Sequence, residues 1–287
     1  MLLVAKNLVA SAMLGVGVVC FALPNMFADL FHLHAMRDEG LIELRAYYGG
    51  TGIGLGAYLL TCQDARQATL LLKSIMVPLG VTRLLTLLPL RRELLAEQPV
   101  ACAMHLFALL GVELPMIVLT TLILWLVRFP PSSLQQQEPM TSQTSKWKVL
   151  KHLVALLWAA ESLLFWVKPV ETAEWFGVGP TGGNGEHPFG VSELRSMWAG
   201  QRFGFALFAK FGGELQSRLF IAIMFSLSAV FRAIAISLYS TFPAVEGDQG
   251  AIPREQLALT AMETAVALLF IRAYAQQRSV LPVAKNN

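Results

Sequence analysis

The feature that most constrains this chain is a series of long apolar stretches that contain few charged side chains. Only 14% of the residues are charged, whereas a soluble domain carries about 25%. So few charges cannot cover a globular surface, but a lipid bilayer requires no such cover. The polar–apolar alternation that is typical of outer-membrane barrels is absent. The sequence therefore predicts an all-α integral membrane protein.

Eight apolar stretches are candidates for transmembrane helices, because a span needs about 20 residues. The second, sixth and eighth are short or interrupted by polar residues. The stretches are Leu8–Leu23, Arg45–Leu60, Leu70–Leu90, Val100–Val127, Val149–Trp166, Met197–Phe211, Leu219–Tyr239 and Leu257–Ala273.

Lysine and arginine are distributed unevenly among the segments that connect these stretches. If eight spans alternate in direction, eleven basic residues fall on one side and five on the other. By the positive-inside rule, both termini then lie on the cytoplasmic-type side of a membrane that the sequence does not identify. The first 23 residues also fit a signal peptide, but the repeat described next favours a retained first helix.

Rare polar residues recur in chain order at a nearly constant spacing, which indicates an internal duplication. Chance matches between two apolar sequences would not bring arginine and glutamate into the same register. The matches are Glu43-Leu44-Arg45 with Glu193-Leu194-Arg195, Gly50 and Gly54 with Gly200 and Gly204, Arg83 with Arg232, and Glu113 with Glu263, all at offsets of 149 or 150 residues.

The duplication divides the chain into two four-helix membrane repeats, residues 1–128 and 147–278. Residues 129–146 between them are rich in Pro, Ser, Gln and Thr, which is the composition of a linker. Residues 279–287 form a polar tail. Because each repeat has an even number of spans, the two would be parallel, related by an axis along the membrane normal.

Ionisable residues inside the spans are the main candidates for a site, since an unpaired charge in a bilayer is costly. We predict an Arg–Glu–Arg cluster in each repeat, in which the glutamate accepts from one or both arginines. Such a cluster is either an ion-pair lock or a polar pocket for a small anion, a proton or a lipid headgroup. The predicted clusters are Arg45, Arg83 and Glu113, and Arg195, Arg232 and Glu263.

Two further charges occur in the second repeat alone. Glu161 and Arg202 both lie near the middle of a span, and the equivalent positions in the first repeat are Val16 and Gly52. Because both charges are present in one repeat and both are absent from the other, we predict that they contact each other.

The glycine-rich run that begins at Gly49 is not a nucleotide-binding loop, because no strand precedes it and it lies inside an apolar stretch. Glycines four residues apart instead allow two helix backbones to approach closely. The predicted packing glycines are Gly50, Gly52, Gly54 and Gly56 in the first repeat and Gly200 and Gly204 in the second.

No nucleophile–base pair, haem motif or phosphate-binding loop is recognisable, so the sequence predicts no cofactor and gives no support for an enzyme. His32 and His34 near Asp29 suggest a metal site, but the equivalent loop offers only His187 and Glu186. We therefore predict no metal.

The run Arg45-Ala46-Tyr47-Tyr48-Gly49-Gly50, followed by Arg83 and Glu113-Leu114, resembles an uncharacterised family of four-helix membrane domains, a domain of unknown function. Each half of the chain resembles one copy, although Trp198-Ala199-Gly200 replaces Tyr-Gly-Gly in the second. The resemblance implies a fold and no activity.

Three functions remain open on the sequence alone, of which a membrane enzyme is the least favoured and the other two are the main candidates. The first is a non-catalytic scaffold or accessory module in a membrane assembly, and the second is a transporter or binder of a small solute or lipid that uses the Arg/Glu clusters. The expected partners are membrane lipids and other membrane proteins, and no nucleic acid.

Overall fold

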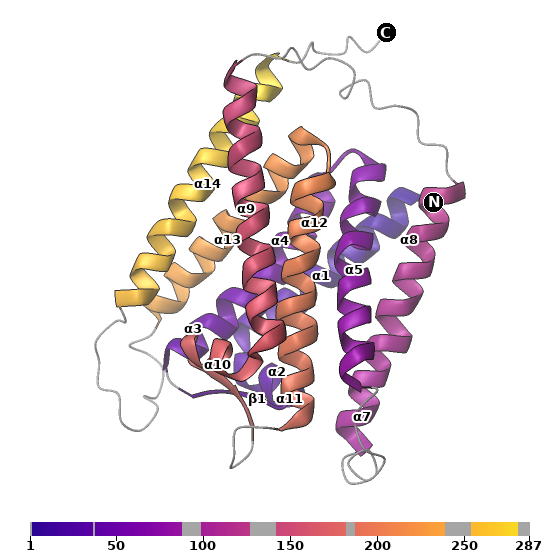
Figure 1. The fold of residues 1–287 in the computed structure, drawn as a ribbon, viewed down its shortest axis with the longest axis vertical. Helices are drawn as coiled ribbons and strands as arrows, with labels where there is room; N and C mark the ends of the chain where they lie inside the picture. The colour runs from indigo at the N-terminus through magenta and orange to yellow at the C-terminus, as the bar shows by residue number, and fades with distance from the viewer. Residues whose placement is uncertain are drawn as a thin grey trace.

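The structure is a computed structural model that describes residues 2–36, 38–87, 99–126, 142–181, 187–238 and 254–280. Within these ranges the chain is helical apart from two short strands and the connecting turns (Figure 1). The elements before residue 127 are α1 (Leu2–Ala22), α2 (Pro24–Leu30), β1 (Leu33–Ala35), α3 (Asp38–Leu44), η1 (Arg45–Gly50), α4 (Thr51–Thr61), α5 (Ala65–Leu87), α7 (Pro99–Leu106), η2 (Phe107–Glu113) and α8 (Leu114–Leu126). The later elements are α9 (Ser142–Val167), α10 (Pro169–Trp175), β2 (Val178–Pro180), α11 (Pro188–Glu193), η3 (Leu194–Gly200), α12 (Gln201–Phe211), α13 (Glu214–Ser237) and α14 (Arg254–Val280).

Within the described residues, each of the eight predicted stretches overlaps a helical segment, and five of these segments are long and apolar enough to cross a membrane. The five are Ala65–Leu87, Phe107–Trp125, Lys146–Val167, Glu214–Ser237 and Arg254–Ser279. Residues Lys6–Ala22 and Pro24–Leu30 would add a sixth as one span, although the chain bends there by 108°. The helical class is therefore confirmed, the five candidate spans agree with a multi-pass membrane protein, and the number eight stays a prediction.

Two predicted boundaries differ from the structure. Helix α9 begins at Ser142, so the last residues of the predicted linker 129–146 are helical, and residues 129–141 lie outside the described ranges. Polar residues there continue a helix whose stability comes from the apolar turns that follow. Helix α14 extends through the first two residues of the predicted tail 279–287, and the rest of the tail lies outside the described ranges.

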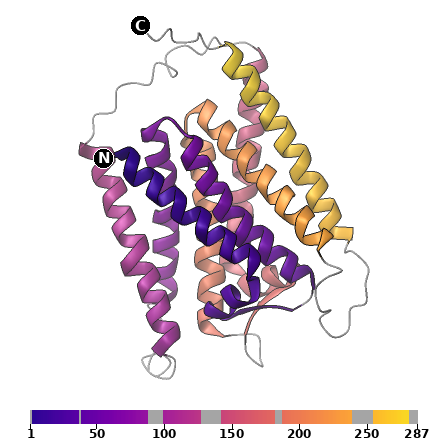
Figure 2. The same ribbon diagram turned by 180° about the vertical axis from the view of Figure 1, so that it is seen from behind.

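The helices of the two halves are interleaved in the packing (Figures 1 and 2). Helix α1 packs along α4, and α4 packs on α13, which packs along α14. In the same way α9 packs along α12, and α12 packs on α5, which packs along α8. Each four-helix group therefore combines two helices from each half, which differs from the expectation that residues 1–128 and 147–278 each form a bundle.

A small antiparallel sheet joins the halves at one end of the helices (Figure 1). His34 of β1 lies opposite Gly179 of β2. The turn before each strand needs a residue with positive φ, which is His32 (55°) in one half and Gly177 (69°) in the other. The sheet and its flanking helices α2 and α10 were not predicted, because each is too short to produce a periodic pattern.

The imidazole rings of His32 and His187 stack beside this sheet, 4.2 Å apart. Burial lowers the pKa of both histidines below the usual value, and for His187 the nearby His32 charge lowers the pKa further. The unfolded chain therefore binds more protons than the folded chain in the pH range between the lowered pKa and 6.5.

The stability that these rings contribute is thus complete above the unfolded pKa and is lost as the pH falls below it. We expect the thermal stability of the wild type to fall more steeply on acidification than that of the His32→Asn, His187→Asn variant. Asparagine tolerates the positive φ at position 32. Parallel pH profiles of the two melting temperatures would contradict this expectation.

Candidate functional site

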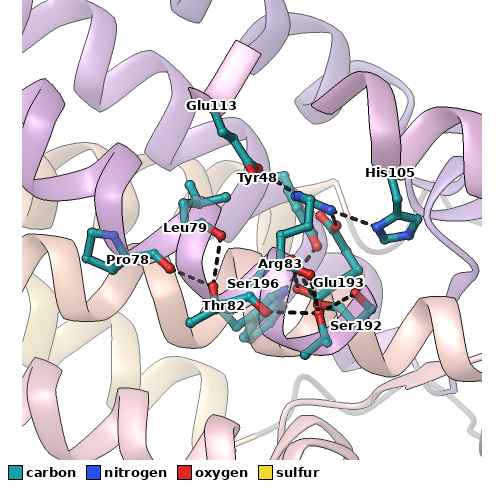
Figure 3. A network of polar contacts seen from close by, with 12 residues as sticks. Tyr48, Pro78, Leu79, Thr82, Arg83, His105, Glu113, Ser192, Glu193 and Ser196 are labelled. Atoms are coloured by element: carbon teal, nitrogen blue, oxygen red, sulfur yellow. Dashed lines mark hydrogen bonds and ion pairs between the residues drawn. The ribbon is translucent and has the colours of Figure 1, made fainter. Parts of the chain in front are cut away.

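Arg83, on α5, is at the centre of a buried polar network (Figure 3). Its Nε donates to Glu113 Oε1 at 2.7 Å, and its Nη1 donates to Glu193 Oε2 at 3.0 Å and to His105 Nδ1 at 2.8 Å. Side-chain exposure is 2% for Arg83, 5% for Glu113 and 0% for Glu193, so the network is sealed by packing. We call these four residues the Arg83 cluster.

Arg232, on α13, has an equivalent set of partners. Nε and Nη2 donate to the two carboxylate oxygens of Glu263, at 3.1 and 3.2 Å, which is the bidentate geometry that suits a guanidinium. Nη1 donates to Glu43 and, at 2.6 Å, to the amide oxygen of Gln256. These four residues form the Arg232 cluster.

Each cluster is completed by a glutamate from the other half of the chain. Glu193 on α11 pairs with Arg83, and Glu43 on α3 pairs with Arg232. Within the described residues, each guanidinium therefore pairs with two carboxylates, one from each half. The ion pairs hold the interleaved helices in register, because each glutamate leads into a helix of the other half that packs against the helix of its arginine: Glu193 precedes α12, which packs on α5, and Glu43 precedes α4, which packs on α13.

The predicted Arg–Glu–Arg composition is wrong in one member of each cluster. Arg45 Nε donates to the carbonyl oxygen of Phe21 at 3.1 Å, and Arg195 Nε donates to that of Trp166 at 3.2 Å. Both arginines thus bind the carbonyl end of the preceding long helix, which lacks intrahelical donors. The repeated tripeptide also contains the residue that does join the cluster, Glu43, two positions before Arg45. Residues two apart face different sides of a helix, so the orientation that brings Glu43 to the cluster turns Arg45 away from it.

Three π-helical turns lie beside the clusters. Turn η2 ends at Glu113. Turn η1 begins at Arg45, shortly after Glu43, and turn η3 begins directly after Glu193. A π turn inserts an extra residue, changes the direction of the side chains that follow, and is frequent at functional sites. Sequence periodicity gave no signal for these turns.

The structure brings Glu161 on α9 and Arg202 on α12 together. Their atoms Oε1 and Nε are 3.2 Å apart, and the guanidinium also lies over the Tyr47 ring, 4.9 Å from its centroid. This is the contact that the comparison of the halves predicts. The two side chains are 22% and 21% exposed, far more than the members of the Arg83 cluster.

A pocket of about 30 Å³ adjoins this pair and the Arg232 cluster. Such a volume has room for one or two water molecules. Its lining includes Glu43, Arg202, Arg232 and Glu263, together with aromatic side chains of η1, α9, α12 and α13. The Arg83 cluster is thus sealed, whereas the Arg232 cluster borders a pocket.

The predicted glycines lie on helix faces that pack against other helices, with different clearances. A Cβ on Gly52 would lie 2.8 Å from the Gly17 Cα, and one on Gly204 would lie 2.6 Å from the Ile75 Cα. Gly56 and Gly200 are similarly tight, Gly54 meets only the flexible end of Met224, and a Cβ on Gly50 would lie 3.6 Å from the nearest atom. Gly52 and Gly56 therefore form the α1–α4 contact, Gly200 and Gly204 form the contact of η3 and α12 with α5, and Gly50 and Gly54 face α13.

We expect Gly52→Ala to destabilise the protein by about 1–3 kcal/mol, because the methyl group would push two helix backbones apart. Gly50→Ala is the matched control, since Gly50 lies just before the same helix and has ordinary clearance. Thermal unfolding in detergent measures both. Equal melting temperatures for the two variants would show that the α1–α4 backbone contact is looser than these distances imply.

A scan against protein-family models finds no match to this chain, and comparisons with curated proteins and with solved structures find no significant match. The resemblance to a family of four-helix membrane domains stays a prediction.

Proposed function

We propose that this chain is a non-catalytic scaffold or accessory module of a membrane assembly, embedded through eight helical spans with both termini on the cytoplasmic-type side. The start of α1 and the end of α14 lie at the same end of the molecule, which supports an even number of crossings (Figures 1 and 2). The four-helix membrane domain family is the proposed relative, on the residues named above.

A second part of the proposal is that the chain consists of two copies of one unit related by a two-fold axis. Helices α2 and α10 have the same length at an offset of 145 residues, and α4 and α12 have the same length at an offset of 150. Equivalent residues also contact each other, as expected on such an axis. His34 is paired with Gly179, and Trp198 Nε1 donates to the Tyr48 hydroxyl at 3.1 Å.

The observation that carries the scaffold function is the use of the buried charges as connections between the halves. Arg83 and Arg232 each bind two carboxylates, and no site for chemistry follows from that arrangement. Apolar side chains on the outer helices are exposed, for example Leu119 on α8, Leu156 on α9 and Leu268 on α14, as a lipid or protein environment requires.

Purification from native membranes in a mild detergent tests the proposal. We expect a partner membrane protein at a fixed ratio, and we expect Glu113→Gln to lower the abundance of the protein because it weakens the Arg83 cluster. If the chain purifies alone, and Glu113→Gln leaves it stable with altered solute binding, the scaffold proposal fails.

The pocket beside Glu161 and Arg202 favours a second candidate, a binder or transporter of a small solute or lipid. For this function, Arg202→Gln would alter the binding of solute or lipid by the purified protein and leave its abundance unchanged. A change in abundance alone would favour the scaffold.

A further inference from the structure

The two clusters carry the same excess of negative charge. Each contains one guanidinium and two carboxylates, so ionisation of both carboxylates leaves a net charge of −1. A net charge in a low-dielectric interior is costly, and a proton is the smallest cation that removes it. The charge count therefore favours one proton, or another cation, in each cluster.

The Arg83 cluster offers specific positions for such a proton. Glu113 Oε2 and Glu193 Oε1 are buried and have no hydrogen-bond partner among the described residues. An ionised oxygen in that position would be left without compensation, whereas a protonated carboxyl would be neutral. Because all four members of the cluster are buried, with Glu113 the most exposed at 4%, packing separates a proton held there from water.

The Arg232 cluster differs because the pocket of about 30 Å³ reaches it. The ionisable groups that face this region are Glu43 from α3, Tyr47 from η1, Glu161 from α9, Arg202 from α12, Arg232 from α13 and Glu263 from α14. Glu161 and Arg202 neutralise each other, so the excess charge is still −1. Ser228 also lines the pocket, and its Oγ donates to Glu263 Oε1 at 2.7 Å, which places a hydroxyl at the carboxyl.

The charged pair beside the pocket is a feature of the second half alone. In the first half, Gly52 lies against Gly17 and leaves no space between α4 and α1. In the second half, Arg202 occupies the position equivalent to Gly52 and pairs with Glu161. Both side chains are about one-fifth exposed, so this pair lies between the pocket and the outside of the protein.

We propose that each cluster holds one proton, and that the proton of the Arg232 cluster exchanges with the surroundings through the pocket while that of the Arg83 cluster is trapped. When the exchangeable proton leaves, it passes to water in the pocket and one carboxyl becomes ionised. The pocket is thus a proton-binding site, and the Arg83 cluster is its sealed counterpart in the same molecule.

Infrared spectroscopy of the full chain in detergent tests this proposal, because the carbonyl stretch of a protonated carboxyl is distinct from that of a carboxylate. At neutral pH we expect two buried protonated carboxyls per chain. One should shift soon after transfer to D₂O and disappear as the pH is raised, and the other should shift only when the protein unfolds. A single population, or two that exchange at the same rate, overturns the proposal.

Variants assign the two signals. Glu263→Gln should remove the exchanging carboxyl, and Glu113→Gln should remove the slow one. Arg202→Gln tests the charge count without disturbing either cluster, because it adds a second excess negative charge at the pocket. We expect it to raise the number of exchanging carboxyls from one to two, and an unchanged number overturns the proposal.

The measurements are repeated with sodium and potassium salts replaced by choline chloride. The exchanging signal should be unaffected. If it is present only without sodium or potassium, a metal cation rather than a proton occupies the site, and the proposal is wrong.

Discussion

Arg83→Met is expected to cause the largest loss of folded protein of any single substitution in the described helices. The variant leaves Glu113 and Glu193 buried without their cation, and removal of one partner of a buried ion pair costs about 3–5 kcal/mol. We expect low abundance in the membrane and a large fall in melting temperature in detergent. Arg66→Met is the control, since Arg66 is exposed on the same helix.

A second variant separates the loss of the ion pairs from the loss of packing. In the variant Arg83→Met, Glu113→Gln, Glu193→Gln, no charge remains in the cluster, and neutral replacement of a complete buried cluster is often tolerated. We expect this variant to regain much of the stability that Arg83→Met loses. If the triple variant is as unstable as the single one, the shape of the arginine rather than its charge is what the fold requires.

The sequence predicted the helical class and most of the charged pairs because both depend on local composition and on residue type. Arg83 with Glu113, Arg232 with Glu263, and Glu161 with Arg202 were identifiable since an ionisable residue in an apolar span needs a partner. The partner from the other half was not identified. Which helix lies beside which depends on tertiary packing, and local composition does not encode it.

The placement of Arg45 and Arg195 illustrates the same limit. Both were predicted to join the clusters, but the clusters contain Glu43 and Glu193 instead. The repeated tripeptide contains both a glutamate and an arginine. Which of the two reaches the cluster depends on the direction of each side chain on the helix. That direction depends on helix α3 beginning at Asp38, several residues before the apolar stretch, and on the π turn that follows.

Cleavage between the halves gives the second large effect that we expect. A protease site introduced within residues 129–141 would separate α8 from α9 without touching a described helix. After cleavage in detergent, a tag on the first fragment should retain the second fragment, because each four-helix group combines helices from both. Fragments that separate promptly would show that the halves do not interleave.

The crossing ion pairs should determine how firmly the fragments associate. In the variant Glu43→Gln, Glu193→Gln, each cluster keeps its own glutamate and loses the one that comes from the other half. We therefore expect the cleaved double variant to release the second fragment at temperatures that leave the cleaved wild type intact.

The control variant Glu171→Gln, Glu255→Gln makes the same change in net charge at exposed positions and should behave as the wild type does. If the two double variants dissociate alike, apolar packing holds the halves together and the crossing pairs contribute little. Because each crossing glutamate also supplies the excess charge of its cluster, a variant that loosens the fragments should at the same time reduce the number of protonated carboxyls.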